Sequence, residues 1–373
     1  MDQYAYRSPG ISIQNIANIY DFGYDELVAL IHKWGEPEYR ASQLWDGLYK
    51  QLWTSADEFT SLPKTFRLKL DENFSGFITD GKPSFTNLNP SRMQKSTDGE
   101  TIKTLFTLRD GKQVEAVLMR YEKRRTLCIS TQAGCAMGCV FCATGQMGFQ
   151  RQLTSGEIVE QVLYYARQLA LVHEQVTNIV VMGMGEPFHN YDATLSAIAL
   201  LNNPNGFNLG ARRFTISTVG LVPGIRRFTQ EHSQINLAIS LHAADDTLRS
   251  QLLPINKKYP LDQLFSSCQE YVQVTHRRLS FEWALIQGVN DTPEQAQMLA
   301  QRLRIFRIGG SILCHVNLIQ LNPTCKYKGQ ASTKQSALAF QSVLDQAGIP
   351  CTIRLRRGIK IQAGCGQLAT EAM

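Results

Sequence analysis

The sequence lacks the features that would point to a membrane or secreted protein. No apolar run approaches the roughly 18 residues that a membrane helix needs. The opening segment MDQYAYRSPG has no basic head followed by an apolar stretch, so it does not resemble a secretory signal. Repeats of fixed period and low-complexity tracts are also missing. We therefore expect a cytoplasmic protein that makes no membrane contact.

Structural disulfide bonds are not expected either, although the chain holds nine cysteines. The number is odd, the chain is long at 373 residues and no leader is apparent, so thiols kept reduced for metal or redox chemistry fit better. The charge is only mildly basic, with 38 Lys and Arg against 32 Asp and Glu. A net charge of +6 suits an anionic partner such as RNA, but many small-molecule enzymes share it.

Residues 1–98 predict a small helical N-terminal accessory domain. Apolar residues recur at three- and four-residue spacing, typical of short amphipathic helices, in segments 24–35, 39–51 and 55–70. The lysines and arginines of this domain could contact nucleic acid, or the domain could serve packing alone. Residues 99–120 predict a β-hairpin linker, because two β-rich runs flank the turn pair Asp110-Gly111.

Residues 121–358 predict an α/β core, because apolar strand-like runs alternate there with helical patterns. The runs are LCIST at 127, NIVVMG at 178, FTIST at 214, NLAISLH at 236, LSFEWALI at 279 and HVNLIQLN at 315. About six such units predict a partial (β/α)6 barrel, with its chemistry at the carboxyl ends of the strands. Residues 359–373 are expected to form a C-terminal tail.

Cys135, Cys139 and Cys142 follow directly on the first of these strands. Three thiolates at C-x3-C-x2-C spacing can hold three irons of a 4Fe-4S cluster and leave the fourth iron open. The open iron can bind the amino and carboxylate groups of S-adenosylmethionine (SAM) and pass it one electron. A structural zinc site is an alternative, but it needs four ligands, and Cys128 lies in the strand and points away from the loop. Ordinary buried cysteines are the other alternative.

Small and polar residues at the ends of the later strands predict a SAM pocket. Gly185 lets the backbone approach a ligand, and the Glu186 carboxylate can receive the SAM ammonium group. Further candidates at strand ends are Ser217, Ser240, Leu241, His242 and Asn322. Each residue alone could equally be a loop turn or a strand-end cap, so the prediction rests on their joint placement.

Together these residues resemble a known family. The segments TLCISTQAGCAMGCVFCATGQMGFQRQL, VVMGMGEP, SLHAADDTLRSQLLPINKKYP, HVNLIQLNP and RGIKIQAGCGQL are similar to those of the RlmN/Cfr family of radical SAM RNA methyltransferases. The resemblance implies methylation of C2 (RlmN) or C8 (Cfr) of an adenine in 23S ribosomal RNA. For RlmN-type members it also implies an adenine in tRNA. Pro187 in GMGEP and the segment PINKKYP favour the RlmN branch.

The same resemblance implies roles for three residues outside the cysteine loop. Cys365 would carry the methyl group, Cys128 would be its partner thiol and Glu115 would be a proton acceptor. A first SAM would methylate Cys365, and a radical made from a second SAM would take hydrogen from that methyl group. The methylene radical would add to the adenine carbon, which is too electrophilic to attack SAM directly. Release of the base would form a Cys128–Cys365 disulfide. Gly364 departs from the alanine common at this place in the family.

Two other function classes compete with this interpretation. One is a radical SAM enzyme that acts on a small molecule or peptide, and the other is a cluster-bearing RNA-binding module without catalysis. Neither needs a methyl-carrying thiol, so the pair Cys128 and Cys365 favours the RNA methyltransferase. Basic runs favour a large anionic substrate, although each could be solvated surface, at Lys123–Arg125, Arg212–Arg213 and Arg354–Arg357. Expected partners are ribosomal RNA, tRNA and an electron donor such as flavodoxin or ferredoxin.

Overall fold

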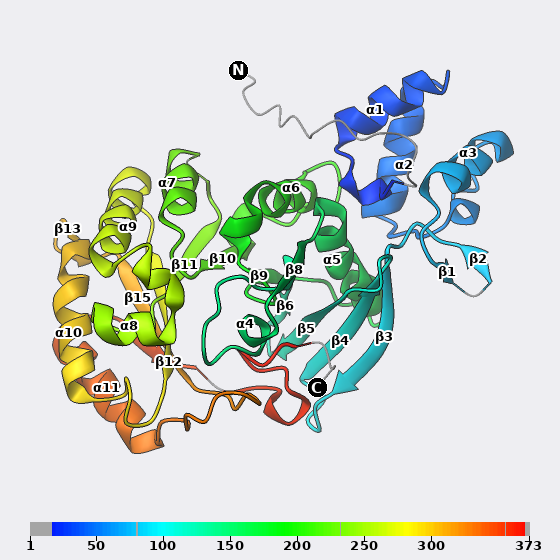
Figure 1. The fold of residues 1–373 in the computed structure, drawn as a ribbon. Coiled ribbons are helices and arrows are strands. Elements are labelled where there is room, and N and C mark those ends of the chain that lie inside the picture. The colour runs from blue at the N-terminus through cyan, green and yellow to red at the C-terminus, as the bar shows by residue number, and fades with distance from the viewer. Residues whose placement is uncertain (1–16, 80, 232, 355, 370–373) are drawn as a thin grey trace.

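The computed structural model describes residues 17–79, 81–231, 233–354 and 356–369. The first sixteen residues of the predicted N-terminal domain and the last four of the predicted tail therefore lie outside the described residues. Figure 1 shows helices at the N-terminal end, a long sheet through the centre and further helices outside the sheet. The C-terminal segment returns to the middle of the molecule, beside the short helix α4 (Ala143–Met147).

The N-terminal helices form because their apolar residues repeat every three or four positions and pack together. The first two predicted helices are present, but the third is broken near Pro63. The proline ring disfavours the helical conformation at Leu62, so a short turn precedes Pro63 and a helix begins after it. The elements are η1 (Ile19–Asp21), α1 (Tyr24–Lys33), α2 (Tyr39–Tyr49), η2 (Ala56–Glu58), α3 (Lys64–Phe74), β1 (Ile78–Thr79) and β2 (Lys82–Pro83).

The centre of the fold is one open sheet of ten strands in the order β16-β15-β12-β11-β10-β9-β6-β5-β4-β3. Neighbouring strands from β6 to β16 are parallel, whereas β5, β4 and β3 continue the sheet in antiparallel pairing. The parallel strands are β6 (Arg124–Cys128), β9 (Asn178–Val181), β10 (Phe214–Thr218), β11 (Asn236–Ser240), β12 (Leu279–Leu285), β15 (Cys314–Gln320) and β16 (Cys351–Ile353). The antiparallel strands are β3 (Leu88–Lys95), β4 (Thr101–Leu108) and β5 (Gln113–Tyr121).

This architecture confirms the predicted partial α/β barrel with a helical N-terminal region. The six predicted runs correspond to β6, β9, β10, β11, β12 and β15. Strand β3 was not predicted, because it lies within 1–98 and shows no apolar alternation. Its register with β4 shifts between Pro90 and Arg92. The predicted hairpin is therefore part of a three-stranded extension of the barrel sheet rather than a separate linker.

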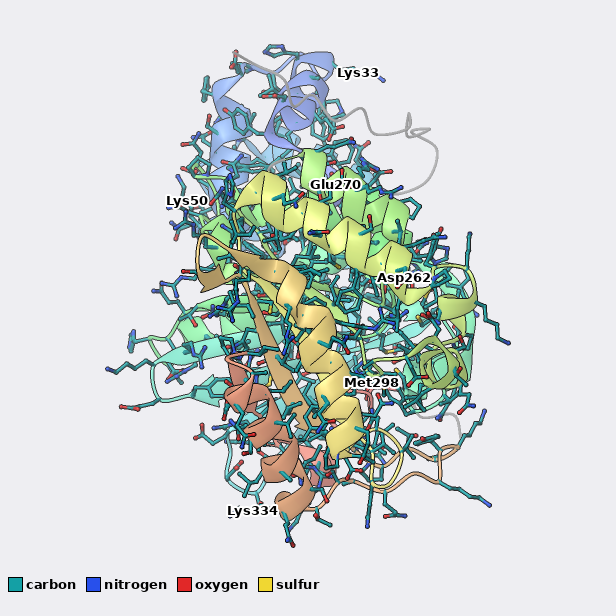
Figure 2. All side chains as sticks on the ribbon, turned by 90° about the vertical axis from the view of Figure 1, so that its left-hand side faces the viewer. Lys33, Lys50, Asp262, Glu270, Met298 and Lys334 are labelled. Carbon is teal, nitrogen blue, oxygen red and sulfur yellow. The ribbon has the colours of Figure 1, made fainter. Side chains whose placement is uncertain are left out.

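Helices follow most parallel strands and cover the sheet, as βαβ connections require. On one side of the molecule, Figure 2 shows α9 (Leu261–Thr275), which carries Asp262, α10 (Pro293–Leu303), which carries Met298, and α11 (Lys334–Gln346), which begins at Lys334. The other helices between the parallel strands are α5 (Ser155–Ala170), α6 (Tyr191–Asn202), α7 (Val222–Gln230) and α8 (Asp246–Leu252). None of the helices in the described part of the chain has the length and apolar character that crossing a bilayer requires.

The remaining short elements lie in the loops that connect the strands and helices. They are β7 (Gln132–Gly134), β8 (Phe149–Gln152), η3 (Pro187–Asn190), η4 (Ala211–Arg213), η5 (Pro254–Lys257), η6 (Arg304–Phe306), β13 (Arg307–Ile308), β14 (Ser311–Ile312) and η7 (Ile359–Ile361). Strands β7 and β8 form their own antiparallel pair, and η5 follows α8 directly. Both lie next to the cysteine loop, so they belong to the frame of the candidate site.

Buried polar contacts hold the N-terminal helices on α5. The Glu160 side chain accepts hydrogen bonds from Asn18 Nδ2 at 2.8 Å and from the Asn87 backbone at 2.7 Å. Asp21 Oδ1 accepts one from the Gly156 backbone at 2.6 Å, at the first turn of α5. A Cβ on Gly156 would lie 2.6 Å from Asn18 Nδ2, so glycine is needed for this close approach.

Candidate active site at the carboxyl ends of the parallel strands

The cysteine loop is closed by the β-pair of β7 and β8. Gly134 has φ +72°, and a Cβ there would lie 1.9 Å from the backbone oxygen of Gly148, so only glycine fits. Gly138 also has a positive φ, +64°. The loop thus turns sharply directly behind β6, at the place where the sequence predicts a metal cluster.

The three loop thiols lie close enough to influence one another. Burial, with contributions from Glu186 and Cys142, raises the pKa of Cys135 to about 12. Burial and the neighbouring Cys142 and Cys135 likewise raise the pKa of Cys139 well above its ordinary value. Thiols in such a place stay protonated unless a cation compensates the charge, which is the situation of iron ligands. The donor set therefore fits a cluster.

The spacing of the thiols differs from that of a site for a single ion. Among the described residues, no three His, Cys, Asp or Glu side chains converge tightly enough to hold one metal ion. A 4Fe-4S cluster has another requirement, since each thiolate ligates a different iron. Phe141, within the loop, is buried, and its ring centroid lies 5.0 Å from that of His242 with the two rings nearly perpendicular.

Glu186 is a buried carboxylate that faces the cysteine loop from the end of β9. Its two oxygens accept hydrogen bonds from the backbones of Phe188 at 3.0 Å and Val219 at 2.8 Å. Burial raises its pKa to about 7, against the effect of these hydrogen bonds. The preceding Gly185 has φ +107°, and a Cβ there would lie 2.7 Å from the side chain of Gln132. The predicted Gly-Glu pair thus lies beside the thiols.

The next two strand ends bring Ser217, Ser240, Leu241 and His242 together. The hydroxyls of Ser217 and Ser240 are 3.3 Å apart. Leu241 is buried, and its N–H donates to the backbone oxygen of Glu282 at 3.0 Å. His242 adopts φ +62°, unusual for a residue with a side chain, and its Nδ1 accepts from the Ala284 N–H at 2.9 Å. Burial and the charge of Arg249 lower the pKa of His242 to about 3, so the ring is neutral at pH 7.

Arg249 is a residue of this site that the sequence analysis did not single out. It is fully buried and donates to the backbone oxygens of Leu241 at 3.1 Å and Val219 at 2.7 Å. It also donates to Asn256 Oδ1 at 2.8 Å, and its charge acts on Cys139. One guanidinium therefore connects the ends of β10 and β11 to each other and to η5.

Cys365 lies within the same region, although it is 223 or more residues from the loop thiols (365 − 142 = 223). The thiols of Cys128 and Cys142 and the carboxylate of Glu282 act on its charge, in that order, after the larger effect of burial. Together they raise its pKa to about 12, even though part of the residue is exposed at the surface. All cysteines of the described residues are free thiols, Cys128 and Cys365 included.

The segment around Cys365 is docked against the cysteine loop. The N–H of Ala143, directly after Cys142, donates to the Gly366 oxygen at 2.8 Å, and Thr144 Oγ1 donates to the Leu368 oxygen at 2.6 Å. Asn322 Nδ2 donates to the Cys365 oxygen at 3.0 Å. Asn322, expected at the SAM pocket, thus holds the tail in this structure.

Glu115 is also bound to the tail. Its Oε1 lies 2.7 Å from Lys103 Nζ, and its Oε2 accepts from the Ala369 N–H at 2.9 Å. Both charged side chains are about 3% exposed, so the pair is buried. Lys103 and Glu282 are further residues near Cys365 that the sequence analysis missed. Glu282 accepts from Asn317 Nδ2 at 2.7 Å, and burial raises its pKa.

The basic runs differ in how far they are free to meet RNA. Arg356 donates to Asn322 Oδ1 at 3.2 Å and to the Leu321 oxygen at 3.1 Å. Arg357 donates to the Arg120 oxygen at 3.0 Å and lies over the ring of Tyr121. Arg356 and Arg357 are therefore half-buried and hydrogen-bonded to the protein, and their expected contact with RNA stays a prediction. Arg354 and Arg124 remain exposed.

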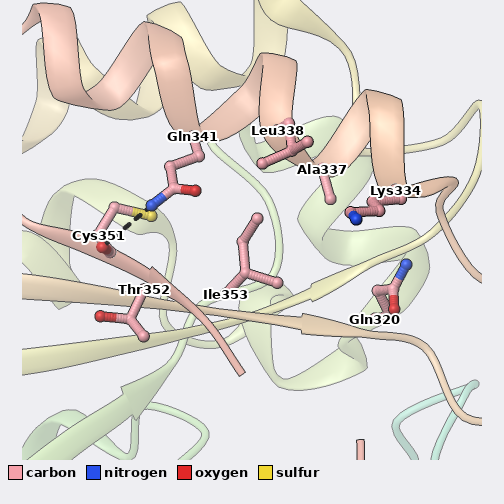
Figure 3. Close-up of a pocket in the computed structure, with 8 residues that line it drawn as sticks. All are labelled: Gln320, Lys334, Ala337, Leu338, Gln341, Cys351, Thr352 and Ile353. Carbon is pink, nitrogen blue, oxygen red and sulfur yellow. Dashed lines mark hydrogen bonds between the residues drawn. The ribbon is translucent and has the colours of Figure 1, made fainter. Parts of the chain in front are cut away.

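A pocket of about 420 Å³ lies elsewhere, between α11 and the strands β15 and β16 at one end of the sheet (Figure 3). It is lined by Gln320, Lys334, Ala337, Leu338, Gln341, Cys351, Thr352 and Ile353. Gln341 Nε2 donates to the Cys351 oxygen across it at 3.4 Å. No predicted site residue lines this pocket, so the candidate site remains at the strand ends.

Comparisons with known proteins agree with this placement. A model of the radical SAM superfamily matches residues 129–300, which include the cysteine loop and the ends of β9, β10 and β11. A model of the ribosomal RNA large subunit methyltransferase N-terminal domain matches residues 17–75. The two matches divide the chain in the same order as its helical end and its barrel.

Individual relatives match along almost the whole chain. The "Dual-specificity RNA methyltransferase RlmN 1" of Myxococcus xanthus is 48% identical over 353 residues, covering 94% of this chain and 94% of that protein. The "Probable dual-specificity RNA methyltransferase RlmN" of Chloroflexus aurantiacus is 48% identical over 356 residues, with 94% and 92% covered. The crystal structure of a radical SAM methyltransferase from Sphaerobacter thermophilus is 46% identical, with a TM-score of 0.88 over 94% of this chain and 98% of that one.

Proposed function

The chain belongs to the RlmN family of radical SAM RNA methyltransferases, and from this premise we propose that it methylates C2 of an adenine in 23S ribosomal RNA and in tRNA. We propose further that the methyl group travels through S-methylated Cys365 and that each product consumes two SAM molecules. The observation that carries the proposal is the docking of the Cys365 segment on the cysteine loop, where the Ala143 N–H donates to the Gly366 oxygen at 2.8 Å and Thr144 Oγ1 donates to the Leu368 oxygen at 2.6 Å.

In the first step the thiolate of Cys365 attacks the methyl carbon of SAM. A carbon–sulfur bond forms on Cys365, the bond to the SAM sulfur breaks, and S-adenosylhomocysteine leaves with the electron pair. The thiol proton passes to solvent, to which Cys365 has access. The hydrogen bonds from Asn322 to the Cys365 oxygen and from Gln367 Nε2 to the Pro323 oxygen at 3.0 Å orient the loop for this attack.

Radical SAM enzymes use a 4Fe-4S cluster and SAM, and here Cys135, Cys139 and Cys142 would hold the cluster. When bound, the cluster supplies the electron that cleaves SAM to a radical able to take hydrogen from the S-methyl group. Glu186 would receive the SAM ammonium group, with Ser217, Ser240 and neutral His242 along the rest of the molecule. Arg249 holds these strand ends in place, and Phe141 excludes water.

Cys128 would release the methylated base. The methylene radical first adds to the adenine carbon, and the adduct gives up its unpaired electron, which a bound cluster could take back, together with the ring proton. The Cys128 thiolate then attacks the sulfur of Cys365, a disulfide forms, and the bond from that sulfur to the methylene carbon breaks. The carbon takes the electron pair and a proton and becomes the methyl group of the product. A cellular dithiol then returns both cysteines to thiols. Glu115 is the proposed acceptor of the ring proton, which requires its carboxylate to leave the contact with Ala369.

We propose that the enzyme works in the cytoplasm with flavodoxin or ferredoxin as its electron donor. Methylation at C8 of the adenine is the competing outcome. The experiment is mass spectrometry of nucleosides from ribosomal RNA and tRNA of cells with and without this protein. We expect 2-methyladenosine in both RNA fractions to depend on the protein. Its appearance in only one fraction narrows the substrate, and protein-dependent 8-methyladenosine contradicts the proposed position.

A further inference from the structure

We propose that Lys103 and Glu115 form a clamp that docks the C-terminal segment on the sheet and thereby positions Cys365 for methyl transfer. The inference rests on the proposed function, because it assigns a task to residues around the methyl-carrying thiol. Lys103 has no part in the chemistry described above. It is nevertheless buried, which is rare for a lysine. A buried ammonium group needs a specific partner and a specific use.

The sheet places the clamp and Cys128 on one face. Lys103 on β4 is paired in register with Val117 on β5, and Val117 is paired with Cys128 on β6. Residues paired across strands point to the same face. Glu115 lies two positions before Val117 and therefore shares that face as well. Lys103, Glu115 and Cys128 thus face the same space, into which the C-terminal segment is folded.

The two charged groups hold the segment on both sides of Cys365. Lys103 Nζ donates to the backbone oxygen of Gln362 at 3.3 Å, three residues before the thiol. Glu115 Oε2 accepts from the N–H of Ala369 at 2.9 Å, four residues after it. The ion pair of 2.7 Å between them joins both attachment points. Cys365 therefore lies at the apex of a loop whose two ends are fixed to neighbouring strands.

The path of the chain supports a docked loop rather than a passing contact. Gly358 and Gln362 adopt φ +63° and +53°, so the backbone turns twice before it reaches Cys365. A Cβ on Gly358 would lie 2.9 Å from Thr101 Cγ2, at the start of β4. Between the attachment points, Ala143 and Thr144 bind Gly366 and Leu368. The hairpin extension and the cysteine loop hold the segment from opposite sides.

Stability alone gives little reason for such a pair. Two charges taken out of water recover their desolvation cost only when the geometry is good and further hydrogen bonds satisfy them, and apolar residues of similar size often serve as well. Here the further hydrogen bonds go to the C-terminal segment itself. Glu115 would also act as clamp and as proton acceptor at different steps of the reaction. Docking is needed before Cys365 is methylated, whereas the ring proton leaves only after RNA has reacted.

The test uses the full-length, anaerobically reconstituted protein and two readouts. The first is hydrogen–deuterium exchange of peptides that cover residues 359–369, and the second is the rate at which SAM methylates Cys365, followed by peptide mass spectrometry. Removing one charge would leave the other buried without a partner, so the principal variant combines Lys103→Met with Glu115→Gln. The matched control removes an exposed pair, Lys82→Met with Asp57→Asn, whose charges lie 3.2 Å apart.

We expect the principal variant to exchange the segment at least tenfold faster and to methylate Cys365 at least tenfold more slowly. Its affinity for SAM, measured by equilibrium dialysis, should stay within twofold, and the control should match the wild type throughout. Wild-type exchange and methylation in the principal variant would overturn the clamp. A loss of SAM affinity in step with methylation would overturn it too, because the pair would then shape the SAM pocket.

The principal variant also separates the two roles of Glu115, because methylation of Cys365 and formation of the RNA product are measured separately. Slow methylation of Cys365 supports the clamp, since no ring proton is involved at this step. Normal methylation of Cys365 with loss of RNA product overturns the clamp role of Glu115 and leaves it as a proton acceptor. A wild-type protein that never methylates Cys365 contradicts the proposed function, and the exchange measurement then still decides the clamp by itself.

Discussion

The side-chain amide of Asn322 donates a hydrogen bond of 3.0 Å to the backbone oxygen of Cys365. The same amide accepts a hydrogen bond of 3.2 Å from Arg356 Nε. A Cβ on Gly364 would lie 2.6 Å from Asn322 Nδ2, so the departure from alanine at this position allows the contact as it stands. The end of β15 is thereby connected to the C-terminal segment through a side chain that the sequence placed in the SAM pocket.

Asn322→Ala should slow methylation of Cys365 more than it weakens SAM binding. One lost hydrogen bond is worth about 1 kcal/mol, or roughly a fivefold change in rate. The measurements are the rate of Cys365 methylation and the affinity for SAM by dialysis. Asn73→Ala on α3, far from the barrel, is the control. A tenfold loss of SAM affinity with normal methylation at saturating SAM would return Asn322 to the SAM pocket.

Loss of the loop thiols should abolish cluster binding. Each of Cys135→Ala, Cys139→Ala and Cys142→Ala removes one of the three proposed iron ligands, and the triple variant removes all of them. After anaerobic reconstitution we expect the visible absorbance and the bound iron of the triple variant to fall to background. Cys325→Ala, an exposed cysteine outside the loop, should keep both. Full iron retention in the triple variant contradicts the cluster assignment.

Cys128→Ala should trap the reaction after RNA has been attacked. Without the thiol that is proposed to break the carbon–sulfur bond, a covalent adduct between Cys365 and RNA should accumulate. A denaturing gel with labelled RNA, run after reaction with SAM and a reductant, measures the adduct. The double variant Cys128→Ala with Cys365→Ala should show none. Normal turnover of Cys128→Ala without an adduct would mean that Cys128 is only a strand residue.

The free energy of unfolding should depend on pH through Glu160, whose side chain lies where the N-terminal helices meet the barrel. Burial raises its pKa from 4.5 to about 8, against the hydrogen bonds of Asn87 and Asn18 and the charge of Arg167. Below about pH 4.5 both folded and unfolded chains hold the proton. As pH rises from there to about 8 the folded chain holds more protons, so unfolding becomes easier, by at most about 1.4 kcal/mol per pH unit.

Glu160→Gln removes the titrating group while keeping an acceptor oxygen. The difference in unfolding free energy between wild type and variant should therefore shift in favour of the variant as pH rises from 5 to 8. Urea unfolding at pH 5, 6, 7 and 8, followed by the fluorescence of the N-terminal tryptophans, gives this difference. A difference that is constant over this range would mean that Glu160 does not titrate there.

The cysteine loop and the strand ends could be predicted because their signals are local. The spacing of Cys135, Cys139 and Cys142 is read from eight consecutive residues, and each parallel strand is an apolar run that ends at a recognisable place. Consecutive parallel strands then bring their ends to one edge of the sheet, whatever the loops between them do. Glu186 and Ser240 reach the site for this reason alone.

Other parts of the site depend on contacts between distant segments. Arg249 looks like a surface residue of a short helix, and it is buried only because backbone oxygens from two other strand ends reach it. Arg356 belongs to a basic run, yet it is half-buried and donates hydrogen bonds to Asn322 and Leu321. Alternation predicts which face of β4 carries Lys103, but not that a segment some 260 residues later covers it, a separation of 362 − 103 = 259.

The carbon added to adenine is proposed to pass through Cys365, and isotope transfer tests this step. The protein is first methylated on Cys365 with SAM that carries a labelled methyl group, freed of SAM, and then allowed a single turnover on RNA with unlabelled SAM. Mass spectrometry of the product nucleoside reads the label. We expect the first methyl group in RNA to carry the label and Cys365→Ala to give no methylated product. An unlabelled first product would contradict this step, because the carbon would then come from SAM without passing through Cys365.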